Sequence, residues 1–180
     1  MAEERVQRRL AAILAADVVG YSRLMEQDGA GTLSRLKAIR REIFEPKTKE
    51  HGGRIFKTMG DGALVEFTSV SGAVRCAIDI QKAVASEGAR NSEKEPIEVR
   101  IGISLGDVIV EGSDLYGNGV NIAARLEALA EPGGICISGN VQEHVKNDDE
   151  FSLQDLGSCN VKNIAEPMKL YQVNVQTDQP

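Results

Sequence analysis

Ile55-Phe56-Lys57-Thr58-Met59-Gly60-Asp61-Gly62-Ala63-Leu64-Val65-Glu66-Phe67 is the stretch around which the rest of the chain can be ordered. Its two apolar runs flank Gly60-Asp61-Gly62, and glycine on both sides of an aspartate suits a tight β-hairpin with positive φ. The predicted hairpin presents the Asp61 carboxylate at its tip and places the cation Lys57 on its incoming strand. Taken alone, the two residues fit either a functional site or a plain surface hairpin with turn and edge residues.

The segments before the hairpin predict a strand and then a helix. Residues 10–21 are nearly all apolar, as in a central strand that is covered on both faces. Apolar residues then recur at steps of three and four over 30–45, which predicts an amphipathic helix facing a core. Pro46 is expected to kink or end this helix.

The segments after the hairpin complete a recognisable order. Ser69 can cap a second amphipathic helix, which is followed by a predicted loop over 86–96. Residues 97–105 alternate as a strand, and Gly106-Asp107 is predicted to turn the chain into a further strand over 108–112. The order strand, helix, hairpin, helix, strand predicts an α+β fold with a ferredoxin-like βαββαβ core and helices on one face.

The remaining chain predicts additional strands and helices on this core. A helix is expected near 119–129, a helical turn near 141–145, and strands over 135–138, 151–156 and 168–175. The last residues, Gln176 to Pro180, look like a tail or a linker.

Composition limits the classes of function. The chain has 180 residues, of which 42% are hydrophobic, enough for one substantial core and most simply a single domain. A net charge of −6 and 4% aromatic residues argue against a nucleic-acid partner. No segment approaches the ~20 apolar residues of a membrane span. Three widely spaced cysteines indicate reduced, mostly buried thiols in a cytoplasmic protein, and His51 and His144 are interpreted as surface residues.

Three polar positions outside the hairpin stand out. Asp17 follows the first apolar run, so it either lies at the strand exit, binds a cation, or serves as a turn or helix-capping residue. Asn121 and Arg125 are four residues apart on a predicted helix and share one face. An amide and a guanidinium in this arrangement can bind a sugar and a phosphate, although the same pair also occurs on ordinary helix surfaces.

Together these residues resemble the class III nucleotidyl cyclase catalytic domains, close to a bacterial subgroup. The resemblance covers almost the whole chain and is carried by three ordered motifs: residues 10–22 ending in Asp-Val-Val-Gly-Tyr-Ser, Lys57-Thr58-Met59-Gly60-Asp61-Gly62, and residues 114–127 with Asn-Ile-Ala-Ala-Arg-Leu-Glu. It implies that residues 1–176 form the cyclase catalytic domain and 177–180 a tail or a truncated linker.

The resemblance implies a two-metal reaction. Asp17 and Asp61 match the aspartates that hold two Mg²⁺ or Mn²⁺ ions per active site, with the carbonyl of Val18 as a further ligand. One ion would activate the ribose 3′-hydroxyl for in-line attack on the α-phosphate, and the other would steady the pyrophosphate. Asn121 would orient the ribose and Arg125 would stabilise charge on the transferring phosphate.

The resemblance also implies how the base is read. Lys57 and Asp114 match the pair that selects adenine, in which Lys57 donates to N1 and Asp114 accepts from the exocyclic amine. Guanine inverts that pattern, so ATP is the expected substrate. Lys162 matches a lysine that meets the terminal phosphates, and an ordinary solvated lysine is the alternative at this position.

In the family the site forms between two chains, which implies a head-to-tail homodimer with two shared sites. The metal aspartates would come from one chain and Lys57, Asp114, Asn121 and Arg125 from the other. A regulatory domain beyond residue 180 is a further expected partner. Ser104 and Ala15-Ala16 depart from residues common in the family, but neither position supplies a named catalytic group.

The expected activity is therefore an adenylate cyclase that converts ATP to 3′,5′-cyclic AMP and pyrophosphate. A guanylate cyclase is one alternative. A catalytically silent, nucleotide-binding regulatory domain is the other.

Overall fold

The computed structural model describes residues 7–90, 94–161 and 165–175. Its βαββαβ core runs from β1 to β4, and further elements follow. The bounds of the core are β1 (Gln7–Val18), α1 (Tyr21–Gln27), α2 (Gly29–Ile39), η1 (Arg40–Phe44), α3 (Glu45–Glu50), β2 (Gly53–Met59), β3 (Gly62–Phe67), α4 (Val70–Arg90) and β4 (Val99–Glu111). The later elements are β5 (Asp114–Tyr116), α5 (Asn118–Leu129), β6 (Ile135–Ser138), α6 (Gly139–Val145), β7 (Leu153–Cys159) and β8 (Met168–Val173).

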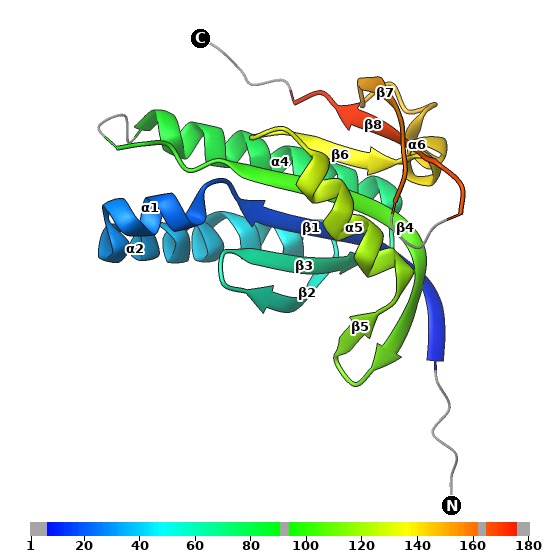
Figure 1. Cartoon of the computed structure of the whole chain (residues 1–180), viewed down its shortest axis with the longest axis horizontal. Coiled ribbons are helices and arrows are strands. Elements are labelled where there is room, and N and C mark those ends of the chain that lie inside the picture. The colour runs from blue at the N-terminus through cyan, green and yellow to red at the C-terminus, as the bar shows by residue number, and fades with distance from the viewer. Residues whose placement is uncertain (1–6, 91–93, 162–164, 176–180) are drawn as a thin grey trace, which may run out of the picture.

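One sheet of eight strands organises the molecule (Figure 1). Its order is β2-β3-β1-β4-β6-β8-β7, with β5 paired to the far end of β4. The first four positions of this order are those of a ferredoxin-like βαββαβ unit, in which β1 lies between β3 and β4. The predicted fold class and the central place of the first strand are confirmed.

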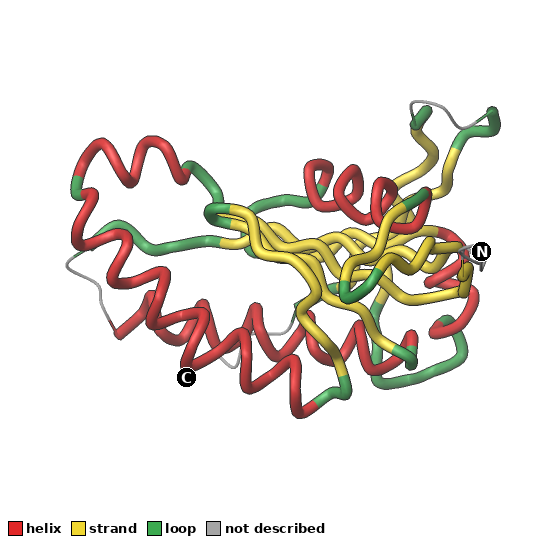
Figure 2. The backbone as a smooth tube through the Cα atoms, turned by 90° about the horizontal axis from the view of Figure 1, so that it is seen from below, coloured by secondary structure: helices red, strands yellow, loops and turns green. Residues whose placement is uncertain are grey.

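Helices cover both faces of the sheet (Figure 2). Alternate residues of β1 enter two cores: Leu14 packs with residues of α4 and the α2–η1 segment, whereas Ile13 packs with Ala123 of α5. The helices of the βαββαβ unit therefore share one face, as predicted, and α5 covers the opposite one. This arrangement explains why the first strand is apolar on both sides.

The predicted turn at Gly106-Asp107 is wrong, because β4 continues through it to Glu111. The reversal occurs instead at Gly112, which has a φ of 62°, and Glu111 then pairs with Asp114. Gly106 is needed for close packing: a Cβ there would lie 3.1 Å from the Cα of Gly119 in α5. The small residue marks a helix contact and not a turn.

The helix boundaries also differ from the prediction. Asp28 caps α2 by accepting from the Gly31 N–H at 3.0 Å, and α1 before it was not predicted. The helix passes through the π-helical turn η1, and Pro46 lies in the first turn of α3, where a missing N–H is tolerated. Helix α4 continues through Ser86, the start of the predicted loop, to Arg90.

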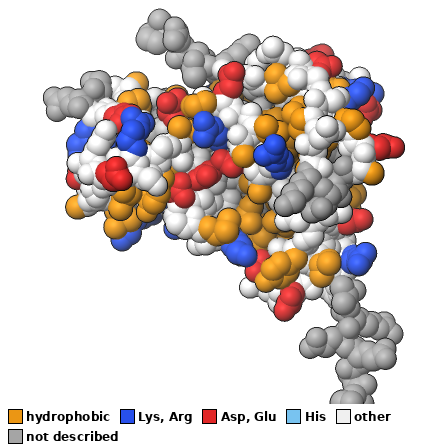
Figure 3. Space-filling model, viewed as in Figure 1, with side chains coloured by type: hydrophobic (Ala, Val, Ile, Leu, Met, Phe, Trp, Pro, Cys, Tyr) orange, Lys and Arg blue, Asp and Glu red, His pale blue; other side chains and the backbone are white. Residues whose placement is uncertain are grey.

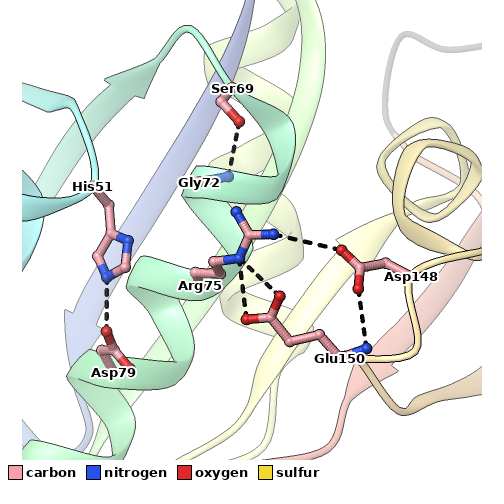
Figure 4. Close-up of polar contacts among 7 residues, drawn as sticks. All are labelled: His51, Ser69, Gly72, Arg75, Asp79, Asp148 and Glu150. Atoms are coloured by element: carbon pink, nitrogen blue, oxygen red, sulfur yellow. Dashed lines mark hydrogen bonds and ion pairs between the residues drawn. The ribbon is translucent and has the colours of Figure 1, made fainter.

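Polar contacts hold helix α4 in place at its start and on its outer face (Figure 4). As predicted, Ser69 caps it, with the Gly72 N–H donating to Ser69 Oγ at 3.0 Å. Arg75 forms ion pairs with Asp148 and Glu150 from the segment between α6 and β7. These contacts connect the first helical layer to the later strands.

The three cysteines are free thiols, and Cys76 and Cys136 are buried as predicted. Burial raises the pKa of Cys76 to about 12 and that of Cys136 to about 11, so both stay protonated. No helix in the described ranges is both long and apolar enough to cross a membrane. The predicted tail lies outside the described residues.

Candidate active site

The predicted metal-binding residues meet at the end of β1. Asp17 is in register with Gly62, which places the hairpin turn carrying Asp61 beside it. Gly62 permits this approach, because a Cβ there would lie 2.9 Å from the Ala16 carbonyl oxygen. Asp17, Val18 and Asp61 line one pocket on this edge of the sheet. The structure thus brings together all three positions.

Asp17 is held in an electrostatically unfavourable place. Burial, a side-chain hydrogen bond with Asp61, and the negative charges of Asp61 and Glu127 raise the pKa of Asp17 to about 7, opposed by a backbone hydrogen bond at Val18. In the described part of the chain, Asp17 Oδ1 is buried without a hydrogen-bond partner. A hard divalent cation would satisfy this oxygen and relieve the repulsion, so the donor set fits Mg²⁺ or Mn²⁺.

Glu127 is a third acidic neighbour, which the sequence analysis did not single out. It lies on α5 where that helix touches β4, since a Cβ on Gly102 would be 2.2 Å from the Glu127 backbone nitrogen. Burial raises the pKa of Glu127, Arg100 opposes this shift, and Asp61 adds to it. Figure 3 shows acidic side chains gathered near the middle of the α5 face. Glu127 therefore adds negative charge to the Asp17–Asp61 pocket.

Lys57 and Asp114 form a second cluster. They come from β2 and β5, and Lys57 Nζ lies 3.9 Å from Asp114 Oδ2. The same ammonium lies 5.6 Å from the centre of the Tyr116 ring. Lys57 therefore pairs with Asp114, 57 positions later in the sequence. This contact joins the two residues that the resemblance implied as a base-reading pair.

Asn121 and Arg125 lie exposed on α5, as their spacing predicted. No side-chain hydrogen bond or ion pair of either residue occurs within the described ranges. Within one chain, the structure does not bring them into contact with Asp17 or Asp61. Lys162, the remaining predicted site residue, lies outside the described residues.

A sequence profile for the adenylate and guanylate cyclase catalytic domain matches residues 4–175. The chain belongs to this family. The profile covers enzymes of both kinds, so it identifies the cyclase domain without choosing between ATP and GTP.

Relatives and solved structures agree with this placement. A protein of Rhizobium meliloti named "Putative adenylate cyclase 3" is 50% identical over 171 residues, which is 95% of this chain and 29% of that protein. The cyclase domain thus matches less than a third of that relative. The crystal structure of an adenylate/guanylate cyclase/hydrolase from Silicibacter pomeroyi has a TM-score of 0.87 at 45% identity, covering 94% of this chain and 98% of that one. The adenylyl cyclase CyaB from P. aeruginosa shares the fold, with a TM-score of 0.85 at 24% identity over 97% and 98% of the chains.

Another group of possible metal ligands in the cyclase domain lies far from the Asp17–Asp61 pocket. Glu50, His51 and Asp79 place one ligand atom each within 4.8 Å of one another. His51 precedes the strand end opposite the hairpin tip, about 17 Å away along β3. The prediction of His51 as a surface residue is wrong: it is partly buried, with Nε2 2.7 Å from Asp79 Oδ2 (Figure 4). His144 is exposed, as predicted.

Proposed function

We propose that this domain is an adenylate cyclase that converts ATP to 3′,5′-cyclic AMP and pyrophosphate. The observation that carries the proposal is the contact of Lys57 with Asp114 at 3.9 Å. It places a hydrogen-bond donor next to an acceptor, and both side chains are partly exposed. Adenine offers the complementary order of an acceptor at N1 beside a donor amine. Guanine offers the inverse order, which would place a donor opposite Lys57 and an acceptor opposite Asp114.

We assign the metal ions to the pocket of Asp17 and Asp61, with the Val18 carbonyl as a further ligand. Two Mg²⁺ or Mn²⁺ ions, when bound, would neutralise the triphosphate and increase the acidity of the ribose 3′-hydroxyl. Asp17 and Asp61 hold negative charge where these ions are needed, and the buried Oδ1 of Asp17 supports this role. Glu127 adds negative charge near Asp17 without being assigned as a ligand.

We further propose that the working unit is a head-to-tail homodimer with two symmetric sites. Asn121 and Arg125 are exposed on α5 and point to no partner within the described part of their own chain. In the dimer, Asn121 would orient the ribose and Arg125 would stabilise charge on the phosphate bound by the other chain's aspartates. Lys162 would approach the terminal phosphates. Residues 1–176 would form the catalytic domain, and ATP as the substrate fits a cytoplasmic location.

The activity can be tested directly. The purified domain is incubated with ATP or GTP in the presence of Mn²⁺, and cyclic nucleotides are measured. Cyclic AMP as the main product is the expected result. A clear preference for GTP would overturn the base assignment. Tight ATP binding without any product would favour the silent regulatory domain over the enzyme.

The shared site has a sharper test, in which two inactive variants are mixed. Asp61→Ala should disable the metal pocket, and Asn121→Ala should disable the group contributed across the interface. After free exchange about half of the dimers are mixed, and each has one intact site, so activity should recover to about a quarter of wild type. Mixing Asp61→Ala with Asp17→Ala is the matched control and should recover nothing. Zero recovery in the first mixture, with exchange confirmed by labelled chains, would contradict the shared site.

A further inference from the structure

Tyr116 touches both members of the Lys57–Asp114 pair, although no family motif discussed above assigns it a role. Its ring centre lies 5.6 Å from Lys57 Nζ, within the range of a cation–π contact. Asp114 lies two residues earlier on the same face of β5. The interaction of the Tyr116 hydroxyl with the carboxylate is the largest cause that lowers the pKa of Asp114, and it raises the pKa of Tyr116.

Packing does not explain a large aromatic side chain at this position. Tyr116 is 44% exposed, and its neighbour Leu115 supplies the buried side chain of the short strand β5. Because so much of the ring is exposed, it adds less to the core than Leu115 does, while it lies beside Lys57. The hydroxyl and the ring face act on different partners, which allows their effects to be separated by substitution.

The contacts leave both charged groups able to bind a ligand. Asp114 Oδ1 accepts from the Leu115 N–H at 2.8 Å, and Oδ2 lies 3.9 Å from Lys57 Nζ. That separation is an ion pair and is longer than a hydrogen bond, so Lys57 keeps N–H donors and Asp114 keeps acceptor sites for a nucleotide base.

We propose that Tyr116 is a positioning residue that holds Lys57 and Asp114 in the order that matches adenine, and that it thereby sets the preference for adenine over guanine nucleotides. The inference rests on the proposed function, because it assumes that this pair reads the base. Without the ring and the hydroxyl, the ammonium and the carboxylate can rearrange around one another. The ammonium and the carboxylate can then also match the donor and acceptor of guanine, so the preference for adenine over guanine nucleotides falls.

Binding of 3′-deoxy-ATP and 3′-deoxy-GTP tests the inference without turnover, because these nucleotides lack the attacking hydroxyl. Dissociation constants are measured by calorimetry with Mg²⁺ for wild type, Tyr116→Phe and Tyr116→Leu. Phe keeps the ring face but loses the hydroxyl, and the preference for the adenine analogue should fall about threefold. Leu loses both contacts, and the preference should fall about tenfold. Tyr171→Phe on β8 removes a phenol hydroxyl elsewhere and should leave the ratio unchanged.

A second measurement separates positioning from direct contact with the base. Carboxyl NMR should show that Tyr116→Phe raises the pKa of Asp114 in the nucleotide-free protein. Equal loss of affinity for both nucleotides in Tyr116→Leu would mean that the ring stacks on the base, and it would overturn the inference. An unchanged preference in both variants, or an unchanged Asp114 pKa, would overturn it as well. Failure of the proposed function has a different signature, namely that the wild-type domain makes no cyclic nucleotide.

Discussion

The carboxyl group of Asp17 follows six consecutive buried residues of β1, so the chain brings an ionisable group to the edge of its core. Burial is the largest cause that raises the pKa of Asp17 to about 7, and the neighbouring carboxyl of Asp61 adds to the cost of ionising it. A proton or a cation can relieve the same repulsion. Without a metal ion, the ionised carboxylates therefore destabilise the fold at the place where the proposed chemistry needs negative charge.

This instability predicts a stabilising but inactivating substitution, Asp17→Asn. The unfolded chain loses the Asp17 proton near its usual pKa of 3.8, whereas the folded chain keeps it until about pH 7. The stability of the wild-type protein should therefore fall as the pH rises from about 3.8 to about 7. The variant has no carboxyl at position 17, so it should lack the part of this fall that Asp17 causes. Above pH 7 we expect Asp17→Asn to be more stable by on the order of 2 kcal/mol, an amount reduced for partial solvent exposure.

Urea unfolding at pH 5 and pH 8 in the presence of a chelator checks this prediction. Asp107→Asn, at an exposed position of β4, serves as the matched control and should follow wild type at both pH values. The same difference between Asp17→Asn and wild type at pH 5 and pH 8 would show that Asp17 does not carry the strain.

At the scale of elements, the backbone of α5 packs directly against the backbone of β4. The small residues Gly102, Ser104 and Gly106 occupy every second position of β4, on the face that the helix covers. A Cβ on Gly102 or Gly106 would meet the α5 backbone, and the buried Ser104 hydroxyl donates to the Gly119 carbonyl. The small Ser104, which departs from the family pattern, thus anchors the start of the helix that carries Asn121 and Arg125.

Gly102→Ala should displace α5 and disturb every group on it. The added methyl group would lie 2.2 Å from the Glu127 nitrogen and 2.5 Å from the Ala123 carbonyl oxygen, so backbone must move. We expect a loss of about 3 kcal/mol in the free energy of unfolding and at least a tenfold loss of cyclase activity. Gly88→Ala in α4 is the matched control: its Cβ would meet only Pro96 at 3.4 Å, and it should be neutral or stabilising. If urea unfolding shows that Gly102→Ala is as stable as the wild-type protein, the close packing of α5 on β4 is refuted.

The pattern of small residues also shows where sequence-based prediction succeeded and failed. The order of elements and the hairpin at Gly60-Asp61 could be predicted because strand alternation and helical periodicity are local. Gly106 was misread as a turn, because a glycine that makes room for a helix and one that turns the chain look alike in isolation. The period-two spacing of Gly102, Ser104 and Gly106 was the signal that could have distinguished them.

At the scale of the whole molecule, local sequence patterns could not predict contacts between distant segments. The resemblance implied that Lys57 and Asp114 act together, and their contact requires β5 to fold back on β4 beside β2. Glu127 was missed because its neighbours come from β1 and β4, and no spacing in the sequence reveals them. The partner across the proposed interface stays a prediction, because the proposed site combines groups of two chains.

The proposed dimer predicts how activity depends on protein concentration. Below the dissociation constant of the dimer, the dimer fraction rises in proportion to total protein, so the specific activity should rise with it. Well above that concentration the specific activity should level off. Cyclase assays over a dilution series, matched to sedimentation velocity and supplemented with an inert carrier protein, provide the measurement. Constant specific activity in samples that sediment as monomers would exclude the shared site.

The backbone contact between α5 and β4 has a consequence for regulation. Side chains can change rotamers and absorb small shifts, but two backbones in direct contact leave no such compliance. The backbone of Asn121 and Arg125 is therefore fixed relative to the sheet of the same chain. We expect a regulatory signal to switch the enzyme by rotating one rigid protomer against the other, so that the geometry inside each protomer is the same in the active and inactive states.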